Sequence, residues 1–202
     1  MDFLTSDEAG IARAIRLLRA GEVIGFPTDT VYGLAALASD ERAVRRVFEV
    51  KGRSLGQPLI LMVAETEWLE AWARVDDRAR EYMQAWWPGP LTLVLPAASW
   101  VGPPLTSSES RRTIAARIPD HPVAMALLRE AGEALATTSA NRSGEPPALT
   151  ALETAWVEGL RAVLDAGKAP GGVPSTLLDL SGERPLVLRP GPVPAEALLL
   201  GR

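Results

Sequence analysis

Short apolar runs alternate with amphipathic segments along almost the whole sequence. Runs such as 22–26, 58–63 and 91–95 have the length and character of strands buried in a sheet. Between them, segments such as 39–51 carry their apolar residues on one helical face. Interleaved strands and helices of this kind predict a mixed α/β fold, in which a twisted mixed sheet is flanked by helices.

Capping residues and turn residues mark where these elements begin and end. Thr5 and Glu8 form a capping-box pattern that predicts the start of a helix, and Gly21 predicts its end. The other expected helices are 39–51, 66–73, 76–86, one that begins with His121 and Pro122, and a short one near 150–156. The expected strands are 22–26, 34–38, 58–63, 91–95, 113–117, 134–138, 161–165, 176–180 and 186–189.

Composition excludes several classes of protein. Cysteine is absent, which excludes disulfides, thiol catalysis and cysteine metal sites, and any histidine site would rest on His121 alone. The first ten residues are acidic and polar, unlike a signal peptide, and no apolar stretch approaches the roughly 18 residues of a membrane helix. We therefore expect a cytoplasmic protein without membrane contact.

Length and net charge further limit the number of domains and the class of protein. The 202 residues are 47% hydrophobic and no linker divides them, so a single domain over residues 1–202 is expected. A net charge of −4 argues against a dedicated nucleic-acid-binding protein. Neither the P-loop pattern nor the Rossmann glycine pattern occurs.

The segment 23–36 begins as a buried strand and breaks at Pro27. Thr28, Asp29 and Thr30 follow in a turn before a second apolar run. A sheet holds the backbone of such a turn while hydroxyl groups project from it, which is typical of ligand sites. A proline turn closed by an Asx-type hydrogen bond explains the same residues without a ligand.

Other element ends carry cations and small polar groups. Lys51 and Arg53 follow a helix, where they can bind adjacent phosphates or only interact with the helix dipole. Arg117 closes a strand and suits either a ligand carboxylate or an internal salt bridge, and Arg189 closes another strand. The turn 138–144 can bind phosphate through its backbone N–H groups or serve as a capped loop. Together these features indicate recognition of phosphate and carboxylate groups.

In these residues the sequence resembles the YrdC-like family, the threonylcarbamoyl-AMP synthases. The matching segments occur in order from about residue 10 to residue 192, nearly the whole chain. They are 27–34, 51–53, 87–92, 116–122, 138–144, 175–176 and 188–191. The resemblance implies a mixed α/β fold with a positively lined, concave cleft, in the short, single-domain form of the family.

The resemblance also implies a reaction. L-threonine, bicarbonate or CO2, and ATP would give threonylcarbamoyl-AMP and pyrophosphate, the first step toward the threonylcarbamoyl group on adenosine 37 of tRNA. Mg²⁺ would be held mainly by phosphates, and no metal-binding residue is implied. Downstream threonylcarbamoyl-transfer proteins are the implied partners, and direct contact with tRNA is left open.

Roles for individual residues follow from the same resemblance. Lys51 and Arg53 correspond to the family's phosphate-binding Lys-x-Arg, and we expect them to act in catalysis. The implied ATP-binding residues are Lys51, Arg53, Thr113, Ser139, Asn141 and Arg189. The implied threonine-binding residues are Thr30, Arg117 and Ser175. Asp29 receives no role, and an ATP contact by Gln57 is left open because many members have asparagine there.

Two other functions are compatible with the same fold. One is a catalytically silent paralogue of the YciO type that acts as an RNA-binding or ribosome-maturation factor. The other is a carbamoyl-transfer module of the kind found in larger hydrogenase-maturation proteins. The presence of both the Lys-x-Arg pair and the Ser-x-Asn pair favours the synthase over the silent paralogue. The lack of accompanying zinc-finger or acylphosphatase segments argues against the carbamoyl-transfer module.

Overall fold

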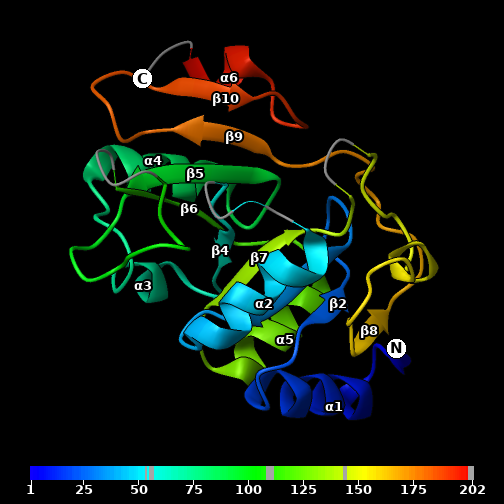
Figure 1. Ribbon diagram of the computed structural model, residues 1–202. Helices are drawn as coiled ribbons and strands as arrows, with labels where there is room; N and C mark the ends of the chain where they lie inside the picture. Colours follow the sequence, from blue (N-terminus) through cyan, green and yellow to red (C-terminus); the bar gives the residue numbers. More distant parts are fainter. Residues whose placement is uncertain (53, 55–56, 108–111, 143–144, 200–202) are drawn as a thin grey trace.

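A ten-stranded mixed sheet organises the protein (Figure 1). The computed structural model describes residues 1–52, 54, 57–107, 112–142 and 145–199. The strands are β1 (Asp2–Thr5), β2 (Ile24–Phe26), β3 (Gly33–Leu37), β4 (Ile60–Met62), β5 (Leu91–Pro96), β6 (Thr113–Arg117), β7 (Leu135–Ser139), β8 (Ala162–Asp165), β9 (Thr176–Asp179) and β10 (Leu186–Arg189). Their order across the sheet is β1-β8-β2-β3-β7-β4-β6-β5-β9-β10.

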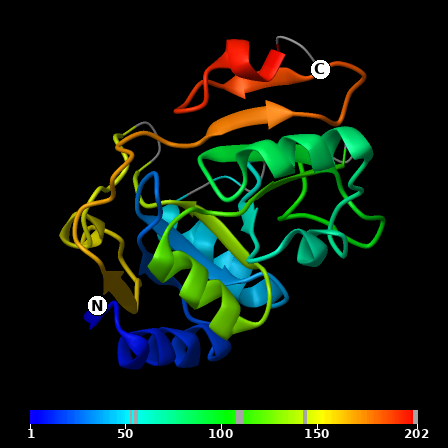
Figure 2. The ribbon, with the colours of Figure 1, turned by 180° about the vertical axis from the view of Figure 1, so that it is seen from behind.

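Helices flank this sheet, which confirms the predicted mixed α/β fold. They are α1 (Glu8–Arg19), α2 (Glu41–Lys51), α3 (Thr66–Leu69), α4 (Asp77–Trp86), α5 (Pro122–Ala131) and α6 (Ala195–Leu199), with a 3₁₀ turn at Leu152–Thr154. Helix α2 covers the face of the central strands seen in Figure 1. Helix α5 lies on the opposite face, and α1 runs along the end of that layer (Figure 2).

The alternation of side chains along β3 shows how one strand serves two cores. Leu34 and Ala36 belong to the apolar cluster that contains α2. Ala35 and Leu37 belong to the cluster that contains α1 and α5. All of these residues are buried, because successive side chains of a strand point to opposite faces and both faces are covered by helices.

Each expected strand is present with its ends within two residues of the prediction, but some local details were wrong. Asp7, not Thr5, caps α1, because its carboxylate accepts the N–H of Gly10 at 2.9 Å. Thr5 instead ends β1, a strand that was not predicted because Leu4 is its one buried residue. The helix expected at 66–73 ends at Leu69, and the one near 150–156 is only a 3₁₀ turn.

The register of β6 places its two terminal residues, Thr113 and Arg117, toward opposite ends of the neighbouring strands. Ile60 of β4 pairs with Ala115 of β6 on one side and with Thr137 of β7 on the other. In this register Thr113 lies toward the end of the sheet where β7 finishes, while the backbone of Arg117 lies toward the other end. Four residues of strand separate them by about 13 Å. No helix in the described part of the chain is long and apolar enough to span a bilayer.

Candidate active site

A pocket of about 530 Å³, including its open mouth, lies among elements from both halves of the sequence. Its walls are the loop between β2 and β3, strands β4, β6 and β7, the segment before β9, and the end of β10. Five of the residues that the sequence assigned to ATP or threonine line it: Thr30, Arg117, Ser139, Ser175 and Arg189.

Thr28 closes the turn between β2 and β3. Its Oγ1 accepts hydrogen bonds from the N–H groups of Thr30 and Val31, both at 3.2 Å, and donates one to the carbonyl of Val31 at 2.6 Å. The segment is therefore a side-chain-closed turn, but the hydroxyl of Thr28 closes it rather than the carboxylate of Asp29. The side chain of Asp29 is left to make a contact outside the turn.

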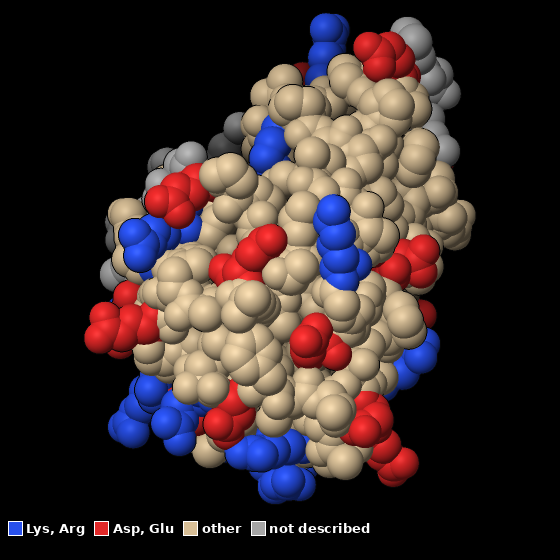
Figure 3. Space-filling view, turned by 90° about the vertical axis from the view of Figure 1, so that its right-hand side faces the viewer, with Lys and Arg blue, Asp and Glu red and all other residues tan. Residues whose placement is uncertain are grey.

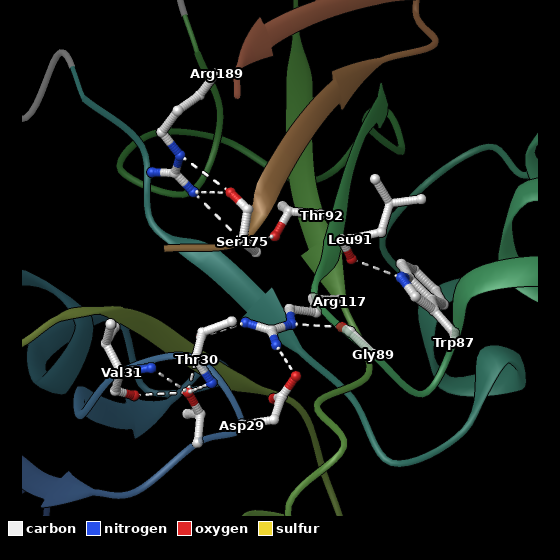
Figure 4. A network of polar contacts seen from close by, with 11 residues as sticks. Asp29, Thr30, Val31, Trp87, Gly89, Leu91, Thr92, Arg117, Ser175 and Arg189 are labelled. Carbon is white, nitrogen blue, oxygen red and sulfur yellow. Dashed lines mark hydrogen bonds and ion pairs between the residues drawn. The ribbon is translucent and has the colours of Figure 1, made fainter. Parts of the chain in front are cut away.

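Arg117 is held from three directions (Figure 4). Its Nε donates to the carbonyl of Gly89 at 2.8 Å, Nη1 donates to Thr30 Oγ1 at 2.9 Å, and Nη2 donates to Asp29 Oδ2 at 2.5 Å. The side chain of Arg117 is only 2% exposed. Burial lowers the pKa of its guanidinium, and the charge of Asp29 opposes that shift. The internal salt bridge considered for Arg117 is thus present inside the pocket that Arg117 lines.

Ser175 and Arg189 form the wall opposite the β2–β3 loop. The guanidinium of Arg189 donates to the carbonyl of Ser175 at 2.9 and 3.2 Å and to its Oγ at 3.3 Å. Thr92 Oγ1 lies 2.7 Å from Ser175 Oγ. Gly191 permits this packing, since a Cβ there would come within 2.4 Å of the backbone nitrogen of Thr176.

The charge of Arg189 distinguishes it from Arg117. Burial lowers the pKa of Arg189. Within the described residues, no carboxylate lies within salt-bridge distance of its guanidinium. A half-buried cation with a carbonyl as its main partner suits an anionic ligand.

Lys51 joins the end of α2 to the end of β7. The helix stops there because Gly52 adopts the left-handed conformation with a φ of 62°. The Nζ of Lys51 donates to Thr138 Oγ1 and to the carbonyl of Ser139, each at 2.7 Å. It also lies 3.4 Å from Asn141 Oδ1, which accepts the hydroxyl of Ser139 at 2.5 Å. The Lys-x-Arg and Ser-x-Asn segments are therefore in contact through Lys51, Ser139 and Asn141.

One described residue that was assigned to ATP lies away from the pocket lining. Thr113 is buried and bonds Ser107 Oγ at 2.7 Å, and it is not among the residues that line the pocket. It faces the same side of the sheet as Arg117, because the two are an even number of residues apart on β6. Arg53 lies outside the described residues, so its expected phosphate contact stays a prediction.

Sequence reasoning missed other parts of the pocket. Thr137 lines it and donates to the carbonyl of Ile60 at 2.9 Å. Its place at the end of an expected strand, next to Thr138, was the available signal. Gly89 lies in the matching segment 87–92 but received no role, because it contributes only a backbone carbonyl that accepts from Arg117 of a distant segment.

The sequence and the overall fold of this chain are similar to those of known proteins. Residues 16–191 match the family model Sua5/YciO/YrdC, which is described as "Telomere recombination". The chain belongs to the Sua5/YciO/YrdC family. Within that family, it is 40% identical over 201 residues to the threonylcarbamoyl-AMP synthase of Bacillus subtilis, covering 98% of this chain and 58% of the relative.

Solved structures of the Sua5/YciO/YrdC family have the same fold. Sua5 of Pyrococcus abyssi complexed with L-threonine superposes with a TM-score of 0.91 at 38% identity, over 98% of this chain and 59% of that one. YciO of E. coli superposes with a TM-score of 0.83 at 26% identity, over 98% of both chains. The chain therefore spans somewhat more than half the length of the Bacillus synthase and of Pyrococcus Sua5.

Proposed function

We propose that this protein forms threonylcarbamoyl-AMP and pyrophosphate from L-threonine, bicarbonate or CO2, and ATP. The observation that carries the proposal is the convergence of Arg117 and Arg189 on one hydroxyl-lined pocket, next to the turn held by Lys51. The family and the 40% identity to a named synthase support the same reaction. The product would pass to threonylcarbamoyl-transfer proteins that modify tRNA.

The two ends of the pocket suit different parts of the reaction. Arg117, Thr30 and Ser175 offer a guanidinium and hydroxyl groups to an amino acid carboxylate and side chain. Arg189, Lys51 and the turn at Ser139 offer cationic and hydroxyl groups to phosphates. We assign L-threonine to the first set and ATP to the second.

The proposed mechanism needs no protein nucleophile. The amine of threonine takes up CO2 and releases a proton to give a carbamate. A carbamate oxygen then attacks the α-phosphorus of ATP, forming one P–O bond while the bond to the leaving pyrophosphate breaks. The protein contributes orientation of the two substrates and stabilisation of the developing negative charge.

Magnesium fits this site as a companion of ATP. Among the described residues, no group of three or more His, Cys, Asp or Glu side chains could hold a metal ion. The pocket offers hydroxyl groups, and Mg²⁺ commonly binds through substrate phosphates and water. When bound in that way it would neutralise charge on the phosphates.

Replacing Lys51 tests the assignment. We expect Lys51→Met to reduce threonine-dependent pyrophosphate release by about 100-fold or more, because a preorganised charge at the phosphates is lost. The matched control is Lys168→Met, since Lys168 is the other lysine of the sequence and is exposed. Thermal unfolding of both variants checks that they remain folded. Release by Lys51→Met within about twofold of the wild type would contradict the proposal.

The same assay separates the synthase from a silent paralogue of the YciO type. Basic and acidic side chains are interspersed on the face in Figure 3, which gives no support there to an extended RNA-binding surface. RNA binding by the wild type without pyrophosphate release, with or without L-threonine and bicarbonate, would favour the paralogue instead.

A further inference from the structure

Asp29 is a largely buried carboxylate beside the pocket. Its side chain is 11% exposed, and its Oδ2 accepts a hydrogen bond from Arg117 at 2.5 Å. It is held between Thr28, which closes the turn, and Thr30, which also contacts Arg117. Gly171 packs against the backbone of this turn, where a Cβ would come within 2.6 Å of the carbonyl of Asp29.

Stability alone is a poor reason for this ion pair. Removing two charges from water costs about as much as their attraction returns, so buried pairs contribute little net stabilisation. The pair does fix the orientation of the guanidinium of Arg117. The carbonyl of Gly89 and the side chains of Thr30 and Asp29 take three of the five N–H groups of Arg117. Within the described part of the chain, the other two are left for a ligand.

The pair also sets the charge of one end of the pocket. In Figure 4, Asp29 lies on one side of the guanidinium of Arg117, and Arg189 lies on the other. Asp29 and Arg117 together carry no net charge, whereas Arg189 has no carboxylate within salt-bridge distance among the described residues. A neutral ion pair suits a zwitterion, and an uncompensated cation suits a phosphate.

We propose that Asp29 is a positioning residue for the amino acid substrate. It orients the guanidinium of Arg117 so that the remaining N–H groups bind the carboxylate of L-threonine. It also neutralises Arg117, which disfavours phosphate at that end of the pocket. This inference rests on the proposed function. It assigns to Asp29 the separation of the amino acid end of the pocket from the nucleotide end.

The test compares Michaelis constants for the two substrates in variants of the full chain. We expect Asp29→Ala to raise the KM for L-threonine by about tenfold or more and to leave the KM for ATP within about twofold. Asp29→Asn keeps an oxygen near Arg117 without the charge, so inorganic phosphate should become a competitive inhibitor against L-threonine in that variant. Asp29→Asn also serves if Asp29→Ala does not fold.

Asp120 provides the matched control. Its charge also raises the pKa of Arg117, but it is exposed and makes no hydrogen bond to that residue. Asp120→Ala should leave the KM for L-threonine within about twofold of the wild type.

A double-mutant cycle with Arg117→Ala separates positioning from general damage. If Asp29 acts through Arg117, then Asp29→Ala should weaken L-threonine binding no further in the Arg117→Ala background, as measured by calorimetry. Additive losses, equal rises in both Michaelis constants, or an unchanged KM for L-threonine in Asp29→Ala would overturn the inference. Absence of threonine-dependent pyrophosphate release in the wild type would instead overturn the proposed function.

Discussion

At the scale of the residue, the hydroxyl of Thr30 has a defined direction. Thr28 gives its hydroxyl hydrogen to the carbonyl of Val31 at 2.6 Å, so the hydrogen between Thr28 and Thr30 comes from Thr30. Thr30 Oγ1 therefore accepts from Arg117 and keeps its remaining lone pair for the pocket that it lines. That lone pair suits an N–H or O–H group of the substrate.

Replacing Thr30 tests this direction. Thr30→Val has nearly the same shape but lacks the acceptor, and it leaves one N–H of buried Arg117 without its partner. The substrate also loses the acceptor that Thr30 offers, and a lost hydrogen bond to a charged group costs about 1.5–3 kcal/mol, so the KM for L-threonine should rise by about tenfold to a hundredfold. Thr30→Ser should restore most of the affinity. Equal KM values for Thr30→Val and the wild type would contradict the assignment.

Candidate site residues at the ends of strands and helices could be recognised from the sequence, but the residues that they contact could not. Lys51, Arg117 and Ser139 were singled out because they follow recognisable strands and helices, and the resemblance to the YrdC-like family then assigned them to the site. The role of Asp29 was not predictable, because an aspartate in a turn suggests a contact within the turn. Its partner, Arg117, is 88 residues away, and only the folded sheet brings them together.

At the scale of the element, helix α5 begins with an unusual cap. The neutral ring of His121 accepts the N–H of Val123 at Nδ1, 3.2 Å away. Burial lowers the pKa of His121, although the nearby carboxylates of Asp29 and Asp120 oppose the shift. A protonated ring would place an N–H against the N–H groups of the helix start, so the cap requires the neutral form.

This cap predicts a dependence of stability on pH. Because the folded pKa of His121 lies below its ordinary value of 6.5, the unfolded chain binds the proton more tightly. The stabilisation is present above pH 6.5 and is lost as the pH falls toward the lower folded pKa. His121→Asn keeps a capping acceptor that does not titrate. Between about pH 7.5 and about pH 5.5, the wild type should lose more thermal stability than His121→Asn. Identical losses in calorimetric scans would show that His121 does not carry this effect.

Helices and strands were predictable where their buried residues form a recognisable pattern in the sequence. Strand β6 was placed at its observed bounds because a polar segment precedes it, Pro119 follows shortly after it, and all five of its residues are buried. Strand β1 and helix α6 were missed, because each has a single buried apolar residue and their pairing depends on distant segments. Short elements at an edge of a fold are set by tertiary contacts more than by their own sequence.

At the scale of the whole molecule, the pocket lies between segments that are far apart in the sequence and belong to different parts of the sheet. Thr30 follows β2, whereas Ser175 precedes β9 and Arg189 ends β10. A ligand that contacts both groups holds these segments together and binds only the folded state. Ligand binding should therefore stabilise the protein as a whole.

Thermal unfolding with ligands measures this coupling. At about 100 times its dissociation constant, a ligand adds about 2.7 kcal/mol to the free energy of unfolding, which corresponds to a rise in Tm of about 5–10 °C for a chain of this size. We expect such a rise with L-threonine and a further rise when ATP is added. D-threonine is the control, and an equal shift with both enantiomers would contradict a stereospecific amino acid site.

Strand β1 has a consequence for how the chain matures. It pairs in parallel with β8, Asp2 to Thr5 lying beside Ala162 to Asp165. Its hydrogen-bond partner is thus synthesised about 160 residues after β1 itself. At about 5–20 residues per second, this interval lasts on the order of ten to thirty seconds. During that time an exposed strand edge has no native neighbour, so chaperones that bind nascent chains have a defined segment to protect.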